Sequence, residues 1–482
     1  MTNLDHALEL VCERAAKADT DRLKRFVSAY FAGVSDAEIE STPAEDLYGA
    51  AVSHWNLALV RERGSAKVRV YTPTYERHGW RSVHSIVDVV CETTPFVVDS
   101  LKMALYAADL NIHGVTHPTF SIRRDANGKI VDFEALVPEQ NGTDTPDPAS
   151  PELFIHFEID RVLDDAQAER IRSAMVSVID AIDAAVTDWQ PMLERLMSAA
   201  EDTATAVDIC GGAECEEAKA LLHWLHAGNF TLLGYYRHAP RGDADQADGT
   251  RLGILRSKYG ETTPIPGPLT DGETKNVIVV TKSDVPSRIH RPGYYDYISV
   301  RQFDDAGDYA GEHIFIGHFT STVFHSNLRE IPWVRLKLER ILEKAPFHAE
   351  THSGRALINA LETLPREALF QFSAEELLAT GSEVARAEER RDVSLFVHTE
   401  PYGRFIWCLV LIPRERFSTQ TRDRVQRILV SEFAAADCEF SVQLSASRLA
   451  RVNFVLRVDP ARSAQSPDIE VLAESLNEAT RR

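Results

Sequence analysis

The stretch Thr93-Thr-Pro-Phe-Val-Val-Asp-Ser-Leu-Lys-Met-Ala-Leu105 decides the fold of the first part of the chain. Thr94 is predicted to cap a helix, and Pro95 fits its first turn, where the missing N–H costs nothing. Val98 and Leu105 then share one apolar face of this helix. The residues before it alternate like a strand, so we expect the helix to pack against a sheet.

Strand patterns surround this helix on both sides. Polar and apolar residues alternate in the flanking segments, and the turn signal Asp125-Ala-Asn-Gly joins two of them as a hairpin. The predicted order β-α-β-β-β-α places helices on a mainly antiparallel sheet, which is an α+β domain. The predicted strands are 67–71, 82–90, 119–124, 130–137 and 153–159, and a long amphipathic helix covers 171–186.

The remainder of the chain alternates between helical and strand-rich regions. Residues 1–60, 190–228 and 331–391 have helical spacing, and the end of the chain, 466–482, has the pattern of a helix without a cap. We expect the natural chain to continue beyond that helix. Predicted strands fall at 232–236, 252–255, 277–281, 297–302 and 314–319, then at 393–397, 405–412, 438–444 and 452–456, with mobile loops at 241–249 and 260–274.

The composition excludes several classes of function. With 482 residues, 44% apolar and 26% charged, the chain is predicted to be a globular protein of several domains. A net charge of −21 argues against a nucleic-acid partner and against anionic membranes, because both are bound mainly through Lys and Arg. No apolar run is long enough to span a bilayer. The polar N-terminus and six scattered cysteines indicate a cytoplasmic protein with reduced thiols.

The motifs of nicotinamide enzymes are absent from the sequence. A dinucleotide pyrophosphate needs a glycine-rich turn before a helix, and no G-x-G-x-x-G or G-x-x-x-x-G-K motif occurs. We therefore predict no catalytic residue and no cofactor within this chain. Cys210 and Cys215 form the one close cysteine pair, but no second Cys/His pair follows at metal-ligand spacing, so no metal site is predicted either.

Seven stretches, taken in their order along the chain, resemble the large NAD-dependent glutamate dehydrogenases of bacteria. They cover roughly residues 40 to 482. They are Thr94-Pro-Phe-Val-Val-Asp-Ser, Leu221-Leu-His-Trp-Leu-His-Ala-Gly-Asn-Phe-Thr-Leu-Leu-Gly-Tyr, Ser287-Arg-Ile-His-Arg-Pro-Gly-Tyr-Tyr-Asp-Tyr-Ile, Arg329-Glu-Ile-Pro, Gly354-Arg-Ala-Leu-Ile-Asn-Ala-Leu-Glu-Thr-Leu-Pro-Arg-Glu-Ala-Leu-Phe-Gln, Tyr402-Gly-Arg-Phe and Leu444-Ser-Ala-Ser-Arg-Leu-Ala-Arg.

The resemblance implies an α+β multi-domain fold. It makes 80–187 and 392–460 two ACT-like domains of the ferredoxin-like α/β type, and 230–325 a PAS-like mixed α/β module. Helical connectors are implied at 188–229 and 326–391. Residues 1–79 would hold N-terminal helices and a leading strand, and 461–482 would begin a truncated helix.

The resemblance also implies what the chain is for. The family oxidises L-glutamate with NAD and water to 2-oxoglutarate, ammonia and NADH, and the resemblance assigns this chemistry, with NAD, to sequence after residue 482. The implied partners are the catalytic region of the same polypeptide and further copies of it, as a tetramer. We expect an N-terminal regulatory and assembly segment, inactive alone, that could sense an amino acid. The alternative is a purely structural scaffold without a ligand.

The turn before the first quoted helix is the candidate effector site. Free N–H groups at a helix N-terminus favour a carboxylate, and in this chain that position holds Thr93 and Thr94, with Asp99 and Ser100 one turn later. An amino-acid effector could dock its carboxylate there. The alternative is that Thr94 only caps the helix, because the glycine usual in amino-acid-sensing ACT modules is missing.

A second candidate site surrounds a Pro-Gly turn. Arg288, His290, Arg291, Tyr294 and Tyr295 could hold an anion or could dock against a neighbouring subunit. Arg and Tyr are enriched at interfaces between proteins, which favours docking.

Overall fold

The computed structural model divides the chain into two compact units. The first comprises Met1–Val186 with the short segment Ser287–Pro292, and the second comprises Thr187–Pro286 and Gly293–Arg482. The structure describes the chain except residues 1, 18, 137–149, 239–250, 257–275, 305, 347, 391, 401, 445–446, 460–466 and 482. The two loops predicted at 241–249 and 260–274 lie outside the described residues, so that prediction remains open.

The first unit is built on a six-stranded antiparallel sheet. Its order is β1-β2-β6-β4-β5, with β3 paired to β6. The five strands predicted for this region are confirmed within a few residues, whereas β3 was not predicted. The strands are β1 (Lys67–Tyr71), β2 (Ser85–Glu92), β3 (Ile112–Thr116), β4 (Thr119–Arg124), β5 (Ile130–Leu136) and β6 (Ser150–Ile159).

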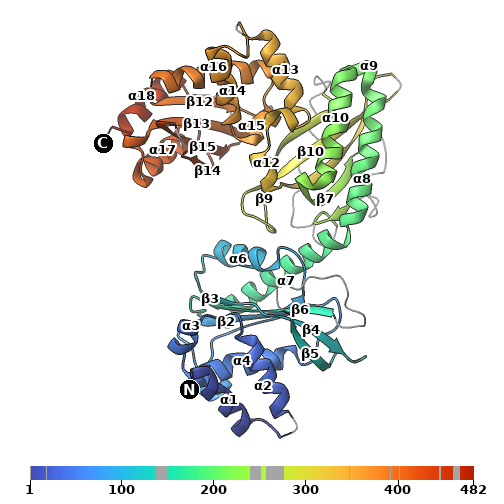
Figure 1. The fold of residues 1–482 in the computed structure, drawn as a ribbon, viewed down its shortest axis with the longest axis vertical. Helices are drawn as coiled ribbons and strands as arrows, with labels where there is room; N and C mark the ends of the chain where they lie inside the picture. The colour runs from blue at the N-terminus through green and yellow to red at the C-terminus, as the bar shows by residue number, and fades with distance from the viewer. Residues whose placement is uncertain are drawn as a thin grey trace. The chain divides into compact units, whose positions relative to one another are not determined.

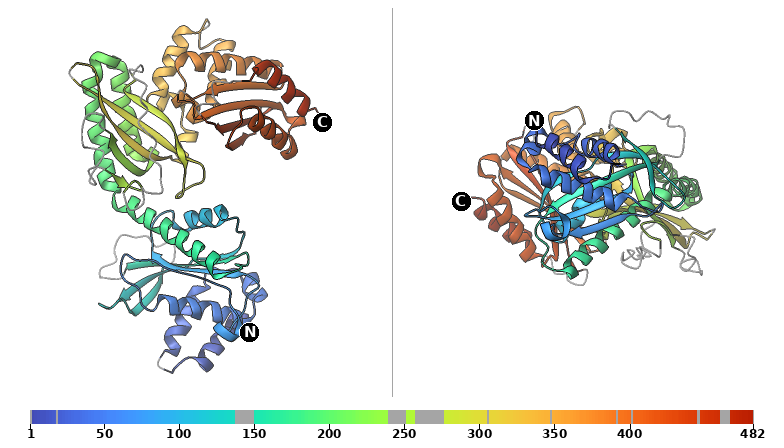
Figure 2. Two further views of the ribbon diagram at one scale, coloured as in Figure 1. Left: turned by 180° about the vertical axis from the view of Figure 1, so that it is seen from behind. Right: turned by 90° about the horizontal axis from the view of Figure 1, so that it is seen from below.

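Helices cover both faces of this sheet. Figure 1 shows α6 and α7 on one face and the N-terminal helices on the other, and Figure 2 shows the same layers from behind. The second face is closed by an apolar core in which Phe26 and Trp55 of the helices meet Phe120 and Phe154 of the sheet. The helices are α1 (Asn3–Arg14), α2 (Thr20–Tyr30), α3 (Asp36–Ser41), α4 (Ala44–Ala58), α5 (Tyr75–His78), α6 (Val97–Ala107) and α7 (Asp165–Thr187).

The start of α6 differs from the prediction. The helix begins at Val97, and its N-cap is Phe96, whose φ of 69° is left-handed and whose side chain makes no capping hydrogen bond. The prediction that Thr94 caps the helix and that Pro95 lies in its first turn was therefore wrong. The left-handed residue turns the chain immediately before the helix, which leaves both residues outside it.

The second unit begins with helices that pack on a five-stranded antiparallel sheet of order β8-β7-β11-β10-β9. All five strands predicted here are present. The strands are β7 (Phe230–His238), β8 (Leu252–Gly253), β9 (Ile278–Pro286), β10 (Tyr294–Phe303) and β11 (Tyr309–Phe319). The preceding helical elements are α8 (Trp189–Asp202), η1 (Thr203–Ala206), α9 (Val207–Cys210), α10 (Gly212–Trp224) and the π-helical turn η2 (Leu225–Asn229).

A helical region and a third sheet complete the second unit. The sheet has the order β12-β13-β15-β14, and one face packs on α17 and α18. Trp407, Leu409 and Leu411 on the other face join the core formed by the helical region. The elements are α12 (Ser321–His325), η5 (Leu328–Glu330), α13 (Val334–Lys344), α14 (His352–Glu362), α15 (Arg366–Gln371), α16 (Ala374–Arg390), β12 (Ser394–Thr399), β13 (Phe405–Pro413), η6 (Arg414–Arg416), α17 (Thr419–Glu432), β14 (Asp437–Gln443), β15 (Leu449–Arg457) and α18 (Ile469–Ala479).

Among the described residues, no helix combines the length and the hydropathy that a bilayer span requires.

Candidate functional site

A layer of buried polar side chains lies between the first sheet and helices α1–α4. The layer arises because β6 is a central strand of a sheet whose two faces are both covered by helices. Polar residues of β6 are therefore buried along with its apolar ones. Glu152, Phe154, His156 and Glu158 face the helices, since alternate residues of a strand share one side. Buried polar groups need partners inside the protein, and two networks supply them.

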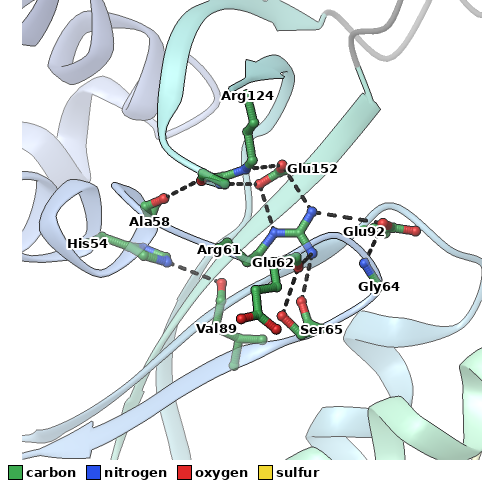
Figure 3. A network of polar contacts seen from close by, with 11 residues as sticks. His54, Ala58, Arg61, Glu62, Gly64, Ser65, Val89, Glu92, Arg124 and Glu152 are labelled. Atoms are coloured by element: carbon green, nitrogen blue, oxygen red, sulfur yellow. Dashed lines mark hydrogen bonds and ion pairs between the residues drawn. The ribbon is translucent and has the colours of Figure 1, made fainter. Parts of the chain in front are cut away.

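The first network joins two arginines to one carboxylate, as Figure 3 shows. Arg124 donates to both oxygens of Glu152, from Nε at 2.7 Å and from Nη2 at 2.7 Å. Arg61, which is 1% exposed, donates from Nε at 3.1 Å and lies 2.9 Å from the carboxylate through Nη2. The Nη1 groups of the two arginines donate to backbone carbonyls, that of Arg61 to Ser65 and that of Arg124 to Ala58.

These contacts make the arginine–glutamate network a structural clamp. It ties the end of α4 and the following loop to the β4–β5 hairpin and to β6. Burial acts to raise the pKa of Glu152, but the hydrogen bonds from Arg124 and Arg61 outweigh it and lower that pKa. A cavity of about 610 Å³ adjoins the network. Because both guanidinium groups are occupied by protein acceptors, we assign the network to stability rather than to ligand binding.

The second network is centred on Asp88 of β2, which is fully buried. Its Oδ1 accepts a hydrogen bond from Nδ1 of His156 at 2.7 Å. Its Oδ2 accepts from Nη2 of Arg69 at 2.8 Å and from the hydroxyl of Tyr71 at 3.1 Å. Burial would raise the pKa of Asp88, but nearby His54, the hydrogen bond from His156 and Arg69 together hold it well below its ordinary value. The group is therefore a carboxylate.

His54 of α4 completes this network as a neutral ring. Its Nε2 lies 3.1 Å from the carbonyl of Val89 and its Nδ1 lies 2.9 Å from the hydroxyl of Tyr30. A carbonyl can only accept, so Nε2 carries the proton and Nδ1 accepts from Tyr30. Burial, the largest influence, lowers the pKa of His54 to about 4.

His54, Asp88 and His156 are residue types that bind metals, and their ligand atoms lie within 4.8 Å of one another. However, the hydrogen bonds just described already use Nδ1 of both imidazoles and both oxygens of the carboxylate. Arg69 also places a positive charge beside the carboxylate, which opposes a cation there. The cluster is accounted for as a hydrogen-bonded network.

A cavity of about 480 Å³ opens beside His156. Its walls come from residues 30–50 of the helical layer, residues 80–84, Thr116 of β3, and His156, Glu158 and Arg161 of β6 and the following turn. All of these residues belong to the first unit. In contrast to the arginine–glutamate network, Nε2 of His156 and the charged groups of Glu158 and Arg161 have no partner among the residues that the structure describes.

The effector residues predicted at the turn before α6 lie in the first unit. Ser100 is buried, and its hydroxyl accepts the backbone N–H of His290 at 2.9 Å. Asp99 is exposed and lies 3.8 Å from Lys102. Thr93 donates its N–H to the carbonyl of Pro151. The hydroxyl of Thr94 is buried without a hydrogen-bond partner in the described part of the chain. The prediction of a ligand at this turn remains open.

The second predicted site is divided between the units. Arg288, His290 and Arg291 belong to the segment assigned to the first unit. The ring of His290 meets that of Phe96 edge to face at 4.5 Å, so the structure brings together two sites that were predicted separately.

Tyr294 and Tyr295 are buried in the second unit. The hydroxyl of Tyr294 donates to Asp437 at 2.7 Å, and the ring of Tyr295 stacks on His318. Whether the predicted site is an interface or an anion site remains a prediction.

The residues of both networks were not predicted from the sequence. Asp88 lies inside the apolar run Ile86-Val-Asp-Val-Val, and His156 lies in Leu153-Phe-Ile-His-Phe-Glu-Ile. The available signal was a charged or polar residue at a position of a buried strand where an apolar residue is expected. Such groups are rarely buried without a partner, so each of them indicates a polar network.

Comparison with known families assigns most of the elements described above. Residues 26–175 match the glutamate dehydrogenase ACT1 domain, residues 331–390 match glutamate dehydrogenase helical motif 1, and residues 394–482 match the glutamate dehydrogenase ACT2 domain. The chain is thus an α+β multi-domain protein that carries two ACT domains and a helical motif between them.

Curated relatives agree with this class. The NAD-specific glutamate dehydrogenase of Pseudomonas aeruginosa is 34% identical over 451 residues, which cover 90% of this chain and 27% of that protein. The one from Halomonas elongata is 33% identical over 485 residues, covering 96% and 29%. The one from Mycobacterium tuberculosis is 27% identical over 443 residues, covering 90% and 26%.

The chain belongs to the family of large NAD-specific glutamate dehydrogenases and corresponds to their N-terminal region. It spans less than a third of the length of the curated relatives it matches.

Proposed function

We propose that this chain is the non-catalytic regulatory and assembly segment of a large NAD-dependent glutamate dehydrogenase. The parent enzyme would convert L-glutamate, NAD and water to 2-oxoglutarate, ammonia and NADH. The observation that carries the proposal is the succession of an ACT1 domain, a helical motif and an ACT2 domain along one chain. Relatives named NAD-specific glutamate dehydrogenase support it over almost the whole length of the chain.

The proposed domain bounds are those expected from the sequence. We propose that residues 80–187 and 392–460 are the two ACT-like domains, which overlap the ACT1 and ACT2 matches at 26–175 and 394–482, and that 188–229 and 326–391 are helical connectors. We propose that 230–325 is a PAS-like module, and its five-stranded antiparallel sheet with helices packed against it supports this. NAD would bind only in the catalytic region, which is the proposed partner of this segment within one cytoplasmic polypeptide that assembles as a homo-oligomer.

The decisive test separates this segment from the catalytic function. The purified 482-residue chain is assayed for glutamate-dependent reduction of NAD, beside the full-length parent protein. We expect activity in the parent and none in the segment. A parent protein that lacks these 482 residues should retain turnover but change its oligomer size or its response to amino acids. Turnover by the segment alone would refute the proposal.

The amino-acid-sensing role is tested at the turn before α6. We propose that an effector carboxylate binds there, and the buried, unpartnered hydroxyl of Thr94 supports a ligand. Calorimetry of the chain with a panel of amino acids, repeated with Thr94→Val, should show binding that the substitution weakens. No effect of Thr94→Val on any binding would remove this site.

A purely structural scaffold is the second candidate function. The observation that favours it is the contact between Ser100 and His290, which uses the Ser100 hydroxyl for a protein partner. Under this alternative the segment organises the oligomer through residues such as Arg288 and Arg291. Replacing both arginines by glutamine should then reduce the oligomer size of the parent protein, as measured by light scattering, and an unchanged size would exclude their part in assembly.

A further inference from the structure

The cavity beside His156 has the size and position of a small-molecule site. Its volume of about 480 Å³ lies within the range of ligand pockets, roughly 300–1,000 Å³. Its lining comes from the helical layer and from the stretch where β3 pairs with β6. Figure 1 shows that this helical layer covers the face of the sheet opposite to α6. The cavity is therefore separate from the α6 turn at which an effector was predicted.

His156 offers this cavity a hydrogen-bond acceptor whose orientation is fixed. Its Nδ1 donates to the buried carboxylate of Asp88, so in the neutral ring Nε2 has no proton. The side chain is 7% exposed and lines the cavity, and no partner for Nε2 is found within the described chain. A carboxylate fixes the tautomer and orientation of metal-binding histidines in this way, and here the same arrangement presents the unprotonated Nε2 to the cavity.

Two carboxylates, those of Glu158 and Asp46, line the same cavity as this acceptor. Glu158 follows His156 on the same face of β6, about 7 Å further along the strand. It lines the cavity with Asp46 of α4, and in the described part of the chain it forms no ion pair. Burial raises the pKa of Asp46, and the charges of Glu45 and Glu158 add to this, whereas the backbone N–H of Arg81, which donates to Asp46 Oδ1 at 3.2 Å, and the charge of Arg81 lower it. Because the carboxylate of Glu158 has no ion-pair partner in the described chain, this side of the cavity favours a positively charged group.

A guanidinium group, that of Arg161, also lines the cavity. Arg161 lies two residues after the end of β6, is exposed, and has no ion-pair partner among the residues that the structure describes. Arg81 also lines the cavity, but its guanidinium lies over the ring of Tyr75. A simple cation would be repelled by Arg161, and a simple anion would be repelled by Glu158 and Asp46. A molecule that carries both charges satisfies both groups.

We infer that this cavity binds a free amino acid, with its ammonium between His156 and Glu158 and its carboxylate on Arg161. The apolar wall, which includes Val34, Leu47 and Trp80, then receives the side chain. As an effector site the cavity rests on the regulatory role proposed above. Binding itself is measured without the parent enzyme, so failure of one proposal is distinguishable from failure of the other.

The test is calorimetry of the 482-residue chain with each of the protein amino acids. An amino acid that gives heat is then compared with its methyl ester, which lacks the carboxylate charge, and with its N-acetyl form, which lacks the ammonium. We expect the free amino acid to bind and both derivatives to bind at least roughly tenfold more weakly, because each loses a charge-assisted contact.

Two variants locate the site. His156→Asn keeps an N–H for Asp88 but removes the acceptor at the Nε2 position, and Arg161→Gln removes an exposed charge that the fold does not use. Each should weaken binding roughly tenfold or more. Arg170→Gln, an exposed arginine of α7 outside the cavity, is the matched control and should bind as the unaltered chain does.

The outcomes are decisive in either direction. Binding of a free amino acid that both His156→Asn and Arg161→Gln weaken, with Arg170→Gln unchanged, supports the inference. No binding of any amino acid, or binding that either cavity variant leaves unchanged, overturns it. Because Arg161 is exposed, loss of binding in Arg161→Gln cannot be attributed to unfolding, and circular dichroism verifies the fold of His156→Asn.

Discussion

Asp88 on β2 and His156 on β6 are cross-strand partners in the first sheet, and their side chains form a 2.7 Å hydrogen bond. The bond depends on register, since a slip of one residue would turn one of the two side chains to the opposite face. The same register places both groups against α4, where His54 joins them. One polar network thus connects the sheet to the helical layer.

The first prediction concerns the pH dependence that His54 gives to the first unit. Its folded pKa of about 4 lies below the ordinary value of about 6.5, because burial disfavours the charged ring. The unfolded chain therefore binds this proton first as the pH falls. The contribution to stability is complete above about pH 6.5 and is lost between pH 6.5 and 4, by roughly 3 kcal/mol.

Hydrogen exchange of strand amides in the first unit, followed between pH 7 and 4, measures this loss. His54→Gln keeps polar atoms for Val89 and Tyr30 but cannot titrate, so its stability should fall less steeply over the same range. Equal slopes for the two proteins would show that His54 does not titrate as inferred. The comparison of slopes removes the contribution of all groups that the two proteins share.

The second prediction concerns the arginine–glutamate clamp. Glu152→Gln leaves the buried guanidinium of Arg61 with only its longer ion pair to Glu92, at 3.9 Å, and breaking a buried ion pair costs about 3–5 kcal/mol. We expect a loss of that order in the unfolding free energy of the first unit, measured by denaturant titration with hydrogen exchange. Glu169→Gln removes an exposed partner of Arg172 and should cost less than about 1 kcal/mol. Similar losses for both variants would contradict the role of the clamp.

Local periodicity was sufficient to predict most elements of the first unit. Strands such as β1 and β4 alternate clearly, and α6 has an apolar face at helical spacing. The missed strand, β3, reads Ile112-His-Gly-Val-Thr, and its glycine and short length give no such pattern. It is a strand because it pairs with the end of β6 that β4 leaves unpaired, which is a tertiary effect.

The polar networks could not be predicted because they depend on long-range pairing. Asp88 and His156 are 68 residues apart in the sequence, and Ser100 and His290 are 190 apart. Local pattern identifies each strand but not its register with a distant partner. The prediction of where α6 starts failed for a different reason. The sequence Thr-Pro-Phe does not indicate the left-handed backbone conformation that Phe96 adopts.

The third prediction concerns Asp183 of α7, which is half-buried. Burial, and then the charges of Glu92 and Asp180, raise the pKa of this carboxyl to about 6. The folded state therefore holds this proton more tightly than the unfolded chain, whose pKa is about 3.9. The stability gained from protonated Asp183 is fully present below about pH 4 and is lost as the pH rises to 6. At neutral pH the ionised Asp183 therefore destabilises the folded protein.

Asp183→Asn should consequently stabilise the first unit at pH 7.5 by roughly 1 kcal/mol, a value reduced to allow for solvent screening. At pH 4 the substitution should change little. Thermal unfolding at the two pH values measures the difference, and Glu134→Gln, an exposed residue of β5, is the control expected to have no effect at either. Equal stabilisation at both pH values would refute the titration of Asp183.

The fourth prediction concerns Gly49 of α4, which lies directly against Trp80. A Cβ at this position would overlap Cβ and Cγ of the indole side chain, which is 3% exposed. Alanine in a helix normally gains up to about 1 kcal/mol over glycine. Because the overlap involves atoms close to the backbone of Trp80, which cannot rotate away, we expect Gly49→Ala to lose roughly 2–3 kcal/mol in total. Gly33→Ala is the matched control, since nothing lies within 4 Å of its Cβ position, and it should be neutral. Denaturant titration followed by tryptophan fluorescence measures both variants, and a stability of Gly49→Ala equal to that of Gly33→Ala would show that Trp80 can move aside.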